Sequence, residues 1–508
     1  MLRAMDQLLR YLVQHPIAGG AALLVIGLFL YLALINSRMN NLPEDLAKIK
    51  QPKWTEAMLR ETYARIEKSP VNVESTKAGL PPKLDRRYIV TGGCGLVGGY
   101  LVLQLLARGQ SPESIRIVDF QSMHRKDMLE STARDTDIIH TDISSPASTD
   151  AAFNKPWPKS VAKLPLTVFH TAAVMVPSDR SKSTYTFLER INIEGTKNVL
   201  AASRRAGADV LVATASASIA VRFVKYFISP WRLLRGWPQN FVQLLTENDF
   251  FRPLRLFDQF YSAYAASKAT AERIICDANC EALRTGTIRP ANGVYGHPTD
   301  NVVGAALNTA AMPAWAYPIV SSFVHGMNCS VAHLHFEAVL ADKRSSTAPQ
   351  AGRPFVVTDP NPPIQFSDLW LAIEKLSVTP FRTISLVPVQ MLLLSYAIEA
   401  YISLPLRFPL LKNILPPLTG DVKHLQPALF SIVTHLYATN DPVGKPVKEG
   451  GLGYRGLVTT TDGVAQELLD WNLEHKGLDN SAWTKYRSSV SMAAELEQIG
   501  VTAKSLQK

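Results

Sequence analysis

The sequence predicts an α/β protein with a doubly wound parallel sheet, a smaller C-terminal substrate lobe and an N-terminal transmembrane helix. After residue 86, short β-branched runs alternate with helical patterns, a glycine-rich turn follows the first run, and a long uncharged segment lies near the N-terminus. Such alternation is typical of a parallel sheet with helices on both faces. The strand candidates are residues 88–91, 115–118, 166–170, 210–213 and 285–289.

The composition indicates a folded protein with an apolar bias. The chain has 508 residues, of which 47% are hydrophobic and 19% charged, so it is neither disordered nor a polytopic membrane protein. Its formal net charge is +10, but the basic residues are scattered and no basic run is interleaved with aromatics. We therefore expect no nucleic-acid binding, and an anionic membrane surface is the favoured partner.

Cysteine usage favours a reducing compartment. The four cysteines, Cys94, Cys276, Cys280 and Cys329, are too few and too irregularly spaced for a disulfide framework. Cys276 and Cys280 are expected to share a helix face, where small buried residues are favoured over a metal site. We expect no metal.

The segment from Ile17 to Ile35 is predicted to be an uncleaved, single-pass membrane anchor. It is uncharged and long enough, at about 1.5 Å per residue, to cross roughly 30 Å of hydrocarbon. A signal peptide would have a shorter apolar region and small residues before its cleavage site. Basic residues are more numerous after the segment, which favours a cytosolic catalytic domain on the endoplasmic reticulum. They are Arg3 and Arg10 before it, and Arg38, Lys48, Lys50 and Lys53 after it.

The rest of the chain divides by composition. Residues 1–36 are the anchor, and residues 37–86, with several prolines and charges, look like a helical or irregular linker. Residues 87–300 form the nucleotide-binding core, with a membrane-facing insertion at about 219–255. Residues 301–508 form the substrate lobe, with an apolar helix at about 387–406 and a C-terminal tail.

A glycine-rich turn marks a Rossmann-type dinucleotide site. An apolar strand is followed by Gly92, Gly93, Gly95, Leu96, Val97 and Gly98, and then by an amphipathic helix. Glycines there allow a sharp turn and let a pyrophosphate approach the positive helix end. Asp119 ends the second strand, where a carboxylate accepts hydrogen bonds from ribose hydroxyls and repels a 2′-phosphate. NAD is therefore preferred over NADP, although Arg125 and Lys126 could soften that preference.

A tyrosine and a lysine in the run YAASK form the candidate catalytic pair. Tyr264 and Lys268 are four residues apart, which places them on one face of a helix. A neighbouring ammonium and a positively charged nicotinamide favour the phenolate, so Tyr264 is a plausible general base. Tyr261 is a rival, but no lysine lies four residues after it. The alternative for such a pair alone is a solvated helix face.

These motifs together resemble the extended short-chain dehydrogenase/reductase superfamily. The resemblance implies that Ser216, after the fourth apolar strand, binds the reacting oxygen, with Thr214 and Ser218 as rivals. It implies that Asn192 holds the adjoining helix and strand in place and that Pro290 shapes the loop beside the nicotinamide. It also implies cofactor contacts at Asp142, Ile143, Thr171, Ala172, Ala173 and Asn192, although packing or capping remains open for each of these. Tyr264, Lys268 and Pro290 are expected beside the cofactor too, with Lys268 hydrogen-bonding the nicotinamide ribose.

Within that superfamily the chain resembles the 3β-hydroxysteroid dehydrogenase/isomerase family, especially the sterol-4α-carboxylate 3-dehydrogenases. The runs VFHTAAV, YAASK, TIRPANGVYG and CSVAHLHFEAVLA occur in that family's order, over about residues 86–475. The resemblance implies NAD-dependent oxidation of a 3β-hydroxyl of a sterol or triterpenoid, with decarboxylation where C4 carries a carboxylate. The anchor, the insertion after Ser216 and the stretch 423–448 depart from the family pattern and leave the substrate open.

Two further features favour a lipid substrate. The insertion combines basic residues with Phe223, Tyr226, Phe227, Trp231 and Trp237, which suits a membrane interface, although a surface insertion packed on its own domain is the alternative. The segment from Val387 to Leu406 contains Pro388 and Glu399, so a membrane-dipping helix or a pocket wall is favoured over a second span.

Several other functions remain open from the sequence. A 3β-hydroxysteroid dehydrogenase/Δ5–Δ4 isomerase would need a further acid or base, and a nucleotide-sugar epimerase would leave the anchor unexplained. Secondary metabolism of a triterpenoid or meroterpenoid would use identical chemistry. An NAD-sensing membrane adaptor would not need Ser216, Tyr264 and Lys268 together. A homodimer and other membrane-bound sterol-modifying enzymes are compatible partners.

Overall fold

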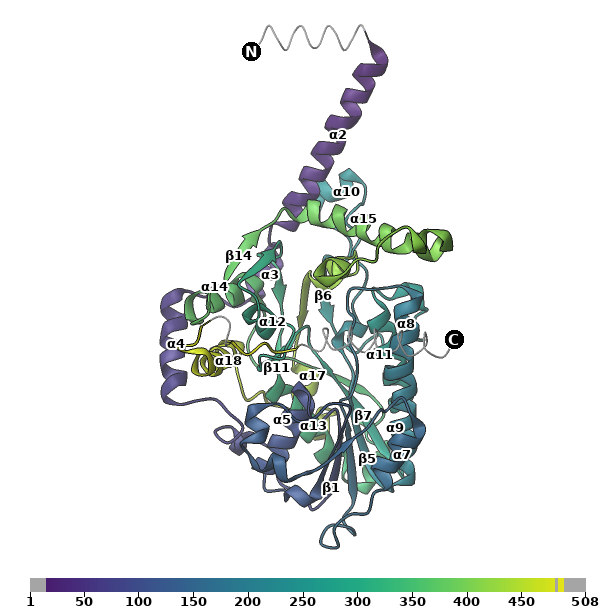
Figure 1. Cartoon of the computed structure of the whole chain (residues 1–508), viewed down its shortest axis with the longest axis vertical. Coiled ribbons are helices and arrows are strands. Elements are labelled where there is room, and N and C mark those ends of the chain that lie inside the picture. Colours follow the sequence, from purple (N-terminus) through teal and green to yellow (C-terminus); the bar gives the residue numbers. More distant parts are fainter. Residues whose placement is uncertain (1–14, 480–482, 488–508) are drawn as a thin grey trace.

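The core of the protein is a parallel sheet of seven strands in the order β12-β7-β5-β4-β1-β2-β3 (Figure 1). This computed structural model describes residues 15–479 and 483–487; Arg3, Arg10 and the C-terminal tail beyond residue 487 lie outside them. The predicted doubly wound fold and its strand candidates are confirmed. The strands are β1 (Arg87–Thr91), β2 (Ile115–Asp119), β3 (Asp137–His140), β4 (Leu166–His170), β5 (Ala208–Thr214), β7 (Arg284–Pro290) and β12 (Pro354–Val357).

Alternate residues of each strand enter two different hydrophobic clusters, as the two-residue period of a strand requires. In β1, Tyr88 and Val90 face α5 (Leu96–Ala107) and α13 (Gly326–Leu340), whereas Ile89 faces the opposite cluster. The helices on the other side are α7 (Pro146–Asn154), α8 (Lys182–Leu188), α9 (Gly195–Arg205) and α11 (Ala263–Asp277).

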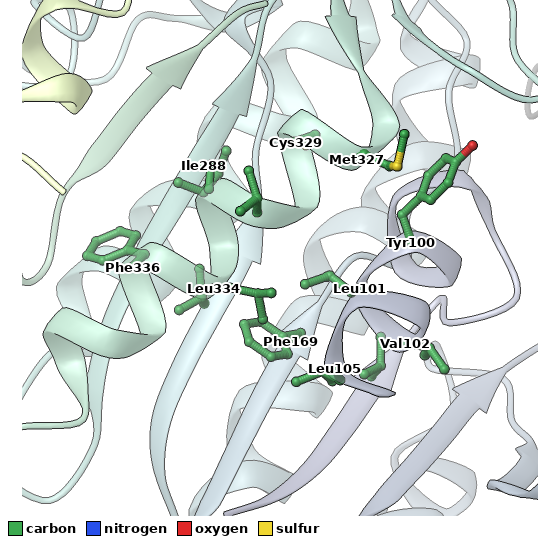
Figure 2. Packing of buried hydrophobic residues seen from close by; sticks show 14 of the residues in the cluster. Tyr100, Leu101, Val102, Leu105, Phe169, Ile288, Met327, Cys329, Leu334 and Phe336 are labelled. Carbon is green, nitrogen blue, oxygen red and sulfur yellow. The ribbon is translucent and has the colours of Figure 1, made fainter. Parts of the chain in front are cut away.

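The sequence predicts an amphipathic helix after the glycine turn, but α5 is buried on nearly all sides. Figure 2 shows Leu101 and Leu105 of α5 among side chains of α13, with Phe169 of β4 close by. Residues from Gly98 to Leu105 are all buried. The reason is that α13, which is more than 200 residues away in sequence, packs beside α5 on the same face of the sheet, while Arg125 and Met128 lie over Gly99 on another side of the helix.

The substrate lobe is built around a second sheet of four strands in the order β13-β10-β15-β6. The expected division at residue 300 is too simple, because α13 and β12 return to the main sheet, where β12 pairs with β7. The strands of the lobe are β6 (Val242–Leu245), β8 (Val294–Tyr295), β9 (Ala311–Ala314), β10 (Val320–Ser321), β11 (Val324–His325), β13 (Ile364–Gln365), β14 (Arg382–Ser385) and β15 (His435–Ala438). The helices of the lobe include α12 (Val303–Leu307), α14 (Phe366–Leu376), α16 (Leu429–Ile432) and α18 (Thr460–His475), whereas α6 (Lys126–Leu129) and α17 (Asp441–Gly444) pack into the core of the main sheet.

Helix α2 (Pro16–Met39) projects away from this body (Figure 1). It and α15 (Pro388–Arg407) are both long and apolar enough to cross a membrane. Leu24 and Phe29 in α2 are more than 70% exposed, whereas Ile35 and Met39 at its foot are buried. The exposed length of α2 is thus distinct from its foot, which packs into the protein.

Residues 37–86 do not form the free spacer that their composition suggests. They contain α3 (Glu44–Ile49) and α4 (Glu56–Lys68), and Trp54, Leu59 and Ile66 are fully or almost fully buried. These side chains pack against residues of α14 and α18. The segment is therefore part of the substrate lobe.

The insertion after Ser216 is also partly packed into the lobe. It contains α10 (Pro230–Arg235) and β6, which pairs with β15. Of the five aromatic residues expected at a membrane interface, Tyr226 is buried, Phe223 and Trp237 are half-buried, and Phe227 and Trp231 are exposed.

The two neighbouring cysteines do not share a helix face. Helix α11 ends at Asp277, which leaves Cys276 buried inside it and Cys280 exposed beyond it. All four thiols are free. Within the described ranges, no group of three or more His, Cys, Asp or Glu side chains is placed to hold a metal ion.

Candidate active site

One cavity of about 1010 Å³ contains most of the predicted site residues. It extends from the glycine turn after β1, past Ser216, Tyr264 and Lys268, to an apolar chamber in the substrate lobe. The strands β1, β2, β4, β5 and β7 end at its wall. Ligands of open parallel sheets bind beyond the carboxyl ends of the strands, and this cavity lies there.

The glycine turn leaves a backbone cradle at the start of α5. Gly92 has φ +72°, and a Cβ added to Gly98 would lie 2.2 Å from the carbonyl oxygen of Gly92. The N-cap residue of α5, Gly95, offers no side-chain cap, so the first-turn N–H groups remain for a ligand. Gly95, Leu96, Val97 and Gly98 line the cavity, which fits a pyrophosphate. Gly93 lies outside its wall, and the position of its missing Cβ faces Ile117.

Asp119 lies at the end of β2, in the cavity wall. Its two carboxylate oxygens accept hydrogen bonds from the backbone N–H groups of Cys94 and Gln121, both at 2.9 Å. Burial raises the pKa of this carboxyl above its ordinary value. The anchored carboxylate keeps lone pairs for the hydroxyl groups of a ribose.

Arg125 and Lys126, the two residues expected to soften the preference for NAD, do not line the cavity, whereas His124 does. Arg125 is buried and donates to the carbonyl oxygens of Gly95 at 3.1 Å and Leu96 at 2.9 Å. Its guanidinium also pairs with Asp127 at 2.6 Å. Arg125 therefore supports the glycine turn from behind, while Lys126 is exposed.

The residues expected to contact the cofactor after β3 and β4 also line the cavity, whereas Asn192, in the helical turn Glu189–Glu194, does not. Asp142, Ile143, Thr171, Ala172 and Ala173 form part of its wall.

Asn192 is buried and binds protein groups on two sides. It accepts from the N–H of Val174 at 2.9 Å, and donates to the carbonyl of Val174 at 3.0 Å and to Ser267 Oγ at 3.1 Å. It ties the loop after β4 to the helix that carries Tyr264, so it is a positioning residue and not a cofactor contact.

Tyr264 and Lys268 lie one turn apart in α11, and both line the cavity. The Nζ of Lys268 donates to the carbonyl oxygen of Thr214 at 2.6 Å. Burial lowers the pKa of Lys268 to about 8. Burial also raises the pKa of Tyr264 to about 12, opposed by a hydrogen bond with Ser216. In the protein alone, burial thus outweighs the hydrogen bond with Ser216, and the expected lowering of the tyrosine pKa by Lys268 is not found.

Ser216 lies immediately after β5 and lines the cavity beside Tyr264. Its Oγ donates to Ser218 Oγ at 2.8 Å. Among the rivals, Thr214 also lines the cavity but is hydrogen-bonded to His333 Nε2 at 2.8 Å, and Tyr261 is fully buried outside the cavity wall. Ser218, the other rival for binding the reacting oxygen, also lines the cavity.

The far end of the cavity is apolar. Its wall is made of side chains that the sequence analysis did not single out, because most of them come from separate loops of the lobe. Those on α14 recur at helical spacing, but that spacing predicts a covered helix face and not a cavity wall. Pro290 borders the passage to them. They include Met312, Trp315, Phe323, Phe366, Trp370, Ile432 and Val433.

More than half of the sequence matches a known family. A sequence model of the 3-beta hydroxysteroid dehydrogenase/isomerase family matches residues 89–228 and 252–386, together more than half of the chain. The chain belongs to this family. The two matched stretches of this family member contain the glycine turn, Asp119, Ser216, Tyr264 and Lys268.

Curated relatives are similar over part of their length. The mouse 3 beta-hydroxysteroid dehydrogenase type 7 is 26% identical over 220 residues, 41% of this chain and 50% of that protein. A decarboxylating sterol-4-alpha-carboxylate 3-dehydrogenase of Schizosaccharomyces pombe is 24% identical over 273 residues, 53% of this chain and 68% of that protein. The chain thus spans about half the length of the mouse relative.

Solved structures resemble this family member more distantly. A UDP-glucose-4-epimerase of Stenotrophomonas maltophila with bound NAD has a TM-score of 0.48 and 15% identity, over 76% of this chain and 98% of that one. A similarity this distant says nothing about the reaction.

Proposed function

We propose that this protein oxidises the 3β-hydroxyl of a membrane-soluble sterol or triterpenoid to a ketone, with NAD as the oxidant. The observation that supports it is the single cavity in which a glycine turn, a Tyr264–Lys268–Ser216 group and an apolar chamber follow one another. A nucleotide sugar would meet aromatic and aliphatic side chains in that chamber, whereas a fused hydrocarbon ring system would bury apolar surface there.

The chain's own residues would divide the work of alcohol oxidation. Ser216 would hydrogen-bond the substrate hydroxyl and orient it toward Tyr264, which would take its proton. Lys268, fixed by the carbonyl of Thr214, would hold the ribose hydroxyls and supply positive charge beside the phenol. The oxidised nicotinamide, when bound, would supply a hydride acceptor and a further positive charge that favours the phenolate.

We propose NAD over NADP because of what surrounds Asp119. Its carboxylate lies at the end of β2 where a 2′-phosphate would have to bind, and like charges repel there. Arg125, which could have balanced that phosphate, is instead used by the glycine-turn carbonyls and Asp127. Arg125 and Lys126 therefore do not weaken the preference.

Decarboxylation would follow where the substrate carries a carboxylate on C4. Oxidation at C3 makes it a β-keto acid, whose C4–carboxylate bond breaks so that carbon dioxide leaves and the electron pair forms an enolate. Ser216 and the protonated Tyr264 would stabilise the enolate oxygen, and C4 then takes up a proton. This step requires no metal.

We further propose that α2 crosses a membrane of the endoplasmic reticulum once and leaves the catalytic domain in the cytosol. Support comes from the exposed apolar side chains along α2 and from the excess of basic residues after it. The free thiols agree with a reducing compartment.

Product analysis of the full-length protein in lipid nanodiscs tests the reaction. The protein is incubated with NAD or NADP and with 4-carboxysterols, simple 3β-hydroxysteroids or UDP-sugars, and NADH and product mass are followed. We expect NADH with sterols and loss of carbon dioxide only with 4-carboxysterols. Turnover of UDP-sugars alone would contradict the proposal, and a Δ4-3-ketone product would favour the isomerase.

A further inference from the structure

Helix α15 has two apolar faces, and only one of them is covered. Val389, Leu392, Ser395 and Ile398 recur at three-residue intervals and are buried against the body. The outer side exposes leucines, and the 3₁₀-helix η8 (Pro409–Asn413) continues the same apolar character. Leu410 is 84% exposed and Ile414 is 71% exposed. The exposed large residues of this stretch are Leu393, Leu394, Leu404, Leu406, Phe408, Leu410 and Ile414.

Helix α10 extends this apolar surface. Trp231 is 75% exposed, and Leu234 and Phe227 are also exposed. The ring of Phe227 contacts that of Tyr396 in α15, with centroids 5.8 Å apart. The exposed residues of α10, α15 and η8 therefore form one surface, which we call the α10–α15 surface.

The α10–α15 surface begins at the foot of α2, where that helix leaves the body (Figure 1). The hydroxyl of Tyr31 donates to the carbonyl oxygen of Ile228 at 2.7 Å, and Arg38 donates to those of Leu233 and Leu234 at 3.1 and 2.9 Å. These bonds join α2 to the segment that contains α10.

A third contact joins α2 to α15. The backbone N–H of Val389 donates to Asn36 Oδ1 at 3.2 Å. If α2 crosses a bilayer, the α10–α15 surface is held at the membrane surface.

The charged residues of the two segments that form this surface are almost all basic. Residues 220–246 contain no acidic residue, and residues 388–419 contain one, Glu399. The guanidinium of Arg180 binds both carboxylate oxygens of Glu399, at 2.5 and 2.6 Å, and neutralises it. Aromatic, aliphatic and basic side chains together are typical of a segment that lies at an anionic lipid interface. The exposed basic residues are Lys225, Arg232, Arg235, Arg407 and Lys412.

The packing of α15 excludes a second crossing in this arrangement. Its covered face shares a core cluster with Ile35 of α2, Ile319 and Phe430. To cross a bilayer, α15 would have to leave that cluster and break the Arg180–Glu399 pair. Figure 1 shows α15 running across the end of α2 and not alongside it.

We propose that the α10–α15 surface lies in the plane of the membrane, among the headgroups and upper acyl chains of an anionic phospholipid bilayer. Trp315 and Ala316 belong both to the cavity wall and to the cluster that joins α2 and α15. The apolar end of the cavity is thereby the end nearest the lipid, where a membrane-soluble substrate is concentrated. This inference rests on the proposed crossing by α2, but not on the proposed reaction.

Lipid contact can be measured on the full-length protein without turnover. In a Cys280→Ser background, which removes the exposed native thiol, single cysteines at Leu394, Leu410 and Trp231 carry a fluorophore. Leu473→Cys, in α18 away from the foot of α2, is the matched control, because Leu473 is 71% exposed. Leu24→Cys reports on α2. The proteins are reconstituted into phosphatidylcholine–phosphatidylserine vesicles with spin-labelled lipids as membrane quencher and iodide as aqueous quencher.

We expect shallow spin-labelled lipids to quench positions 394, 410 and 231 several-fold more than position 473, and iodide to give the reverse order. Equal depths at 394 and 410 support an in-plane helix, whereas a steep depth difference between them indicates a second span and overturns the inference. Protection from iodide without lipid quenching indicates a second protein copy and also overturns it. If position 24 is not quenched by lipid, α2 does not cross the membrane, and the inference that rests on this crossing is overturned with it.

Discussion

Replacing Tyr264 by phenylalanine removes a single oxygen atom from the cavity and tests the proposed chemistry directly. A positioned general base contributes about 10²–10⁴ in rate. Tyr264→Phe is therefore expected to lower kcat/KM for the alcohol by about that factor, which corresponds to about 3 to 5 kcal/mol of transition-state stabilisation.

The structure indicates that the fold and the cofactor site should survive this change. Ser216 keeps its hydrogen bond to Ser218 at 2.8 Å, and Lys268 keeps its bond to the carbonyl of Thr214 at 2.6 Å. No buried polar group that the structure describes around Tyr264 loses its last partner, so the free energy of unfolding should change by less than about 1 kcal/mol. The dissociation constant for NAD should be unchanged.

The assay follows NADH formation at saturating NAD, together with NAD binding and the melting temperature of each variant. Tyr261→Phe is the control, since Tyr261 is three residues away, fully buried and outside the cavity wall, and should keep its activity.

A pH profile adds a second readout. Burial raises the pKa of Tyr264 to about 12 in the protein alone, so its base form is scarce at neutral pH and kcat/KM of the wild type should rise with pH. Tyr264→Phe should lose that slope. Wild-type activity with an unchanged pH profile in Tyr264→Phe would refute the assignment of the base.

Three further changes probe the cofactor site and the buried charges. Asp119→Ala should raise KM for NAD by about ten- to a hundredfold, the effect of losing hydrogen bonds to a charged group, while kcat changes little; an unchanged ratio of NAD to NADP use would contradict its role. Burial and the charge of Asp300 raise the pKa of Glu467 well above its usual range. Glu467 therefore contributes its full stabilisation at a pH below its unfolded pKa of about 4.3, and this stabilisation is lost as pH rises through its folded pKa. Glu467→Gln should therefore raise the melting temperature relative to wild type more at alkaline than at acidic pH, and a gain independent of pH would argue against a protonated Glu467. Arg289→Met leaves Glu272 buried without its 2.6 Å partner and should cost about 3–5 kcal/mol in chemical unfolding, whereas Arg344→Met, in an exposed ion pair, should cause no measurable change.

The sequence determined the parts of this protein that depend on local spacing. The β-branched runs, the glycine turn and Asp119 follow one another within a few tens of residues. Each of these patterns predicts its local structure without reference to distant parts of the chain. Tyr264 and Lys268 are likewise placed on one helix face by their four-residue separation alone. The strands, the glycine turn, Asp119 and the Tyr264–Lys268 pair were predictable for this reason, whereas the other residues expected at the cofactor end of the cavity came from the family resemblance.

Only the tertiary structure decided which of these groups contact a ligand and which contact the protein. Arg125 looks like a phosphate-binding residue in the sequence, but its guanidinium donates to the carbonyl oxygens of the glycine turn. Asn192 hydrogen-bonds to Val174 and Ser267 and does not line the cavity. The apolar chamber is assembled from segments that are far apart in the chain. Burial and hydrogen bonding of a side chain depend on partners that are distant in sequence, and no local period encodes which partner will arrive.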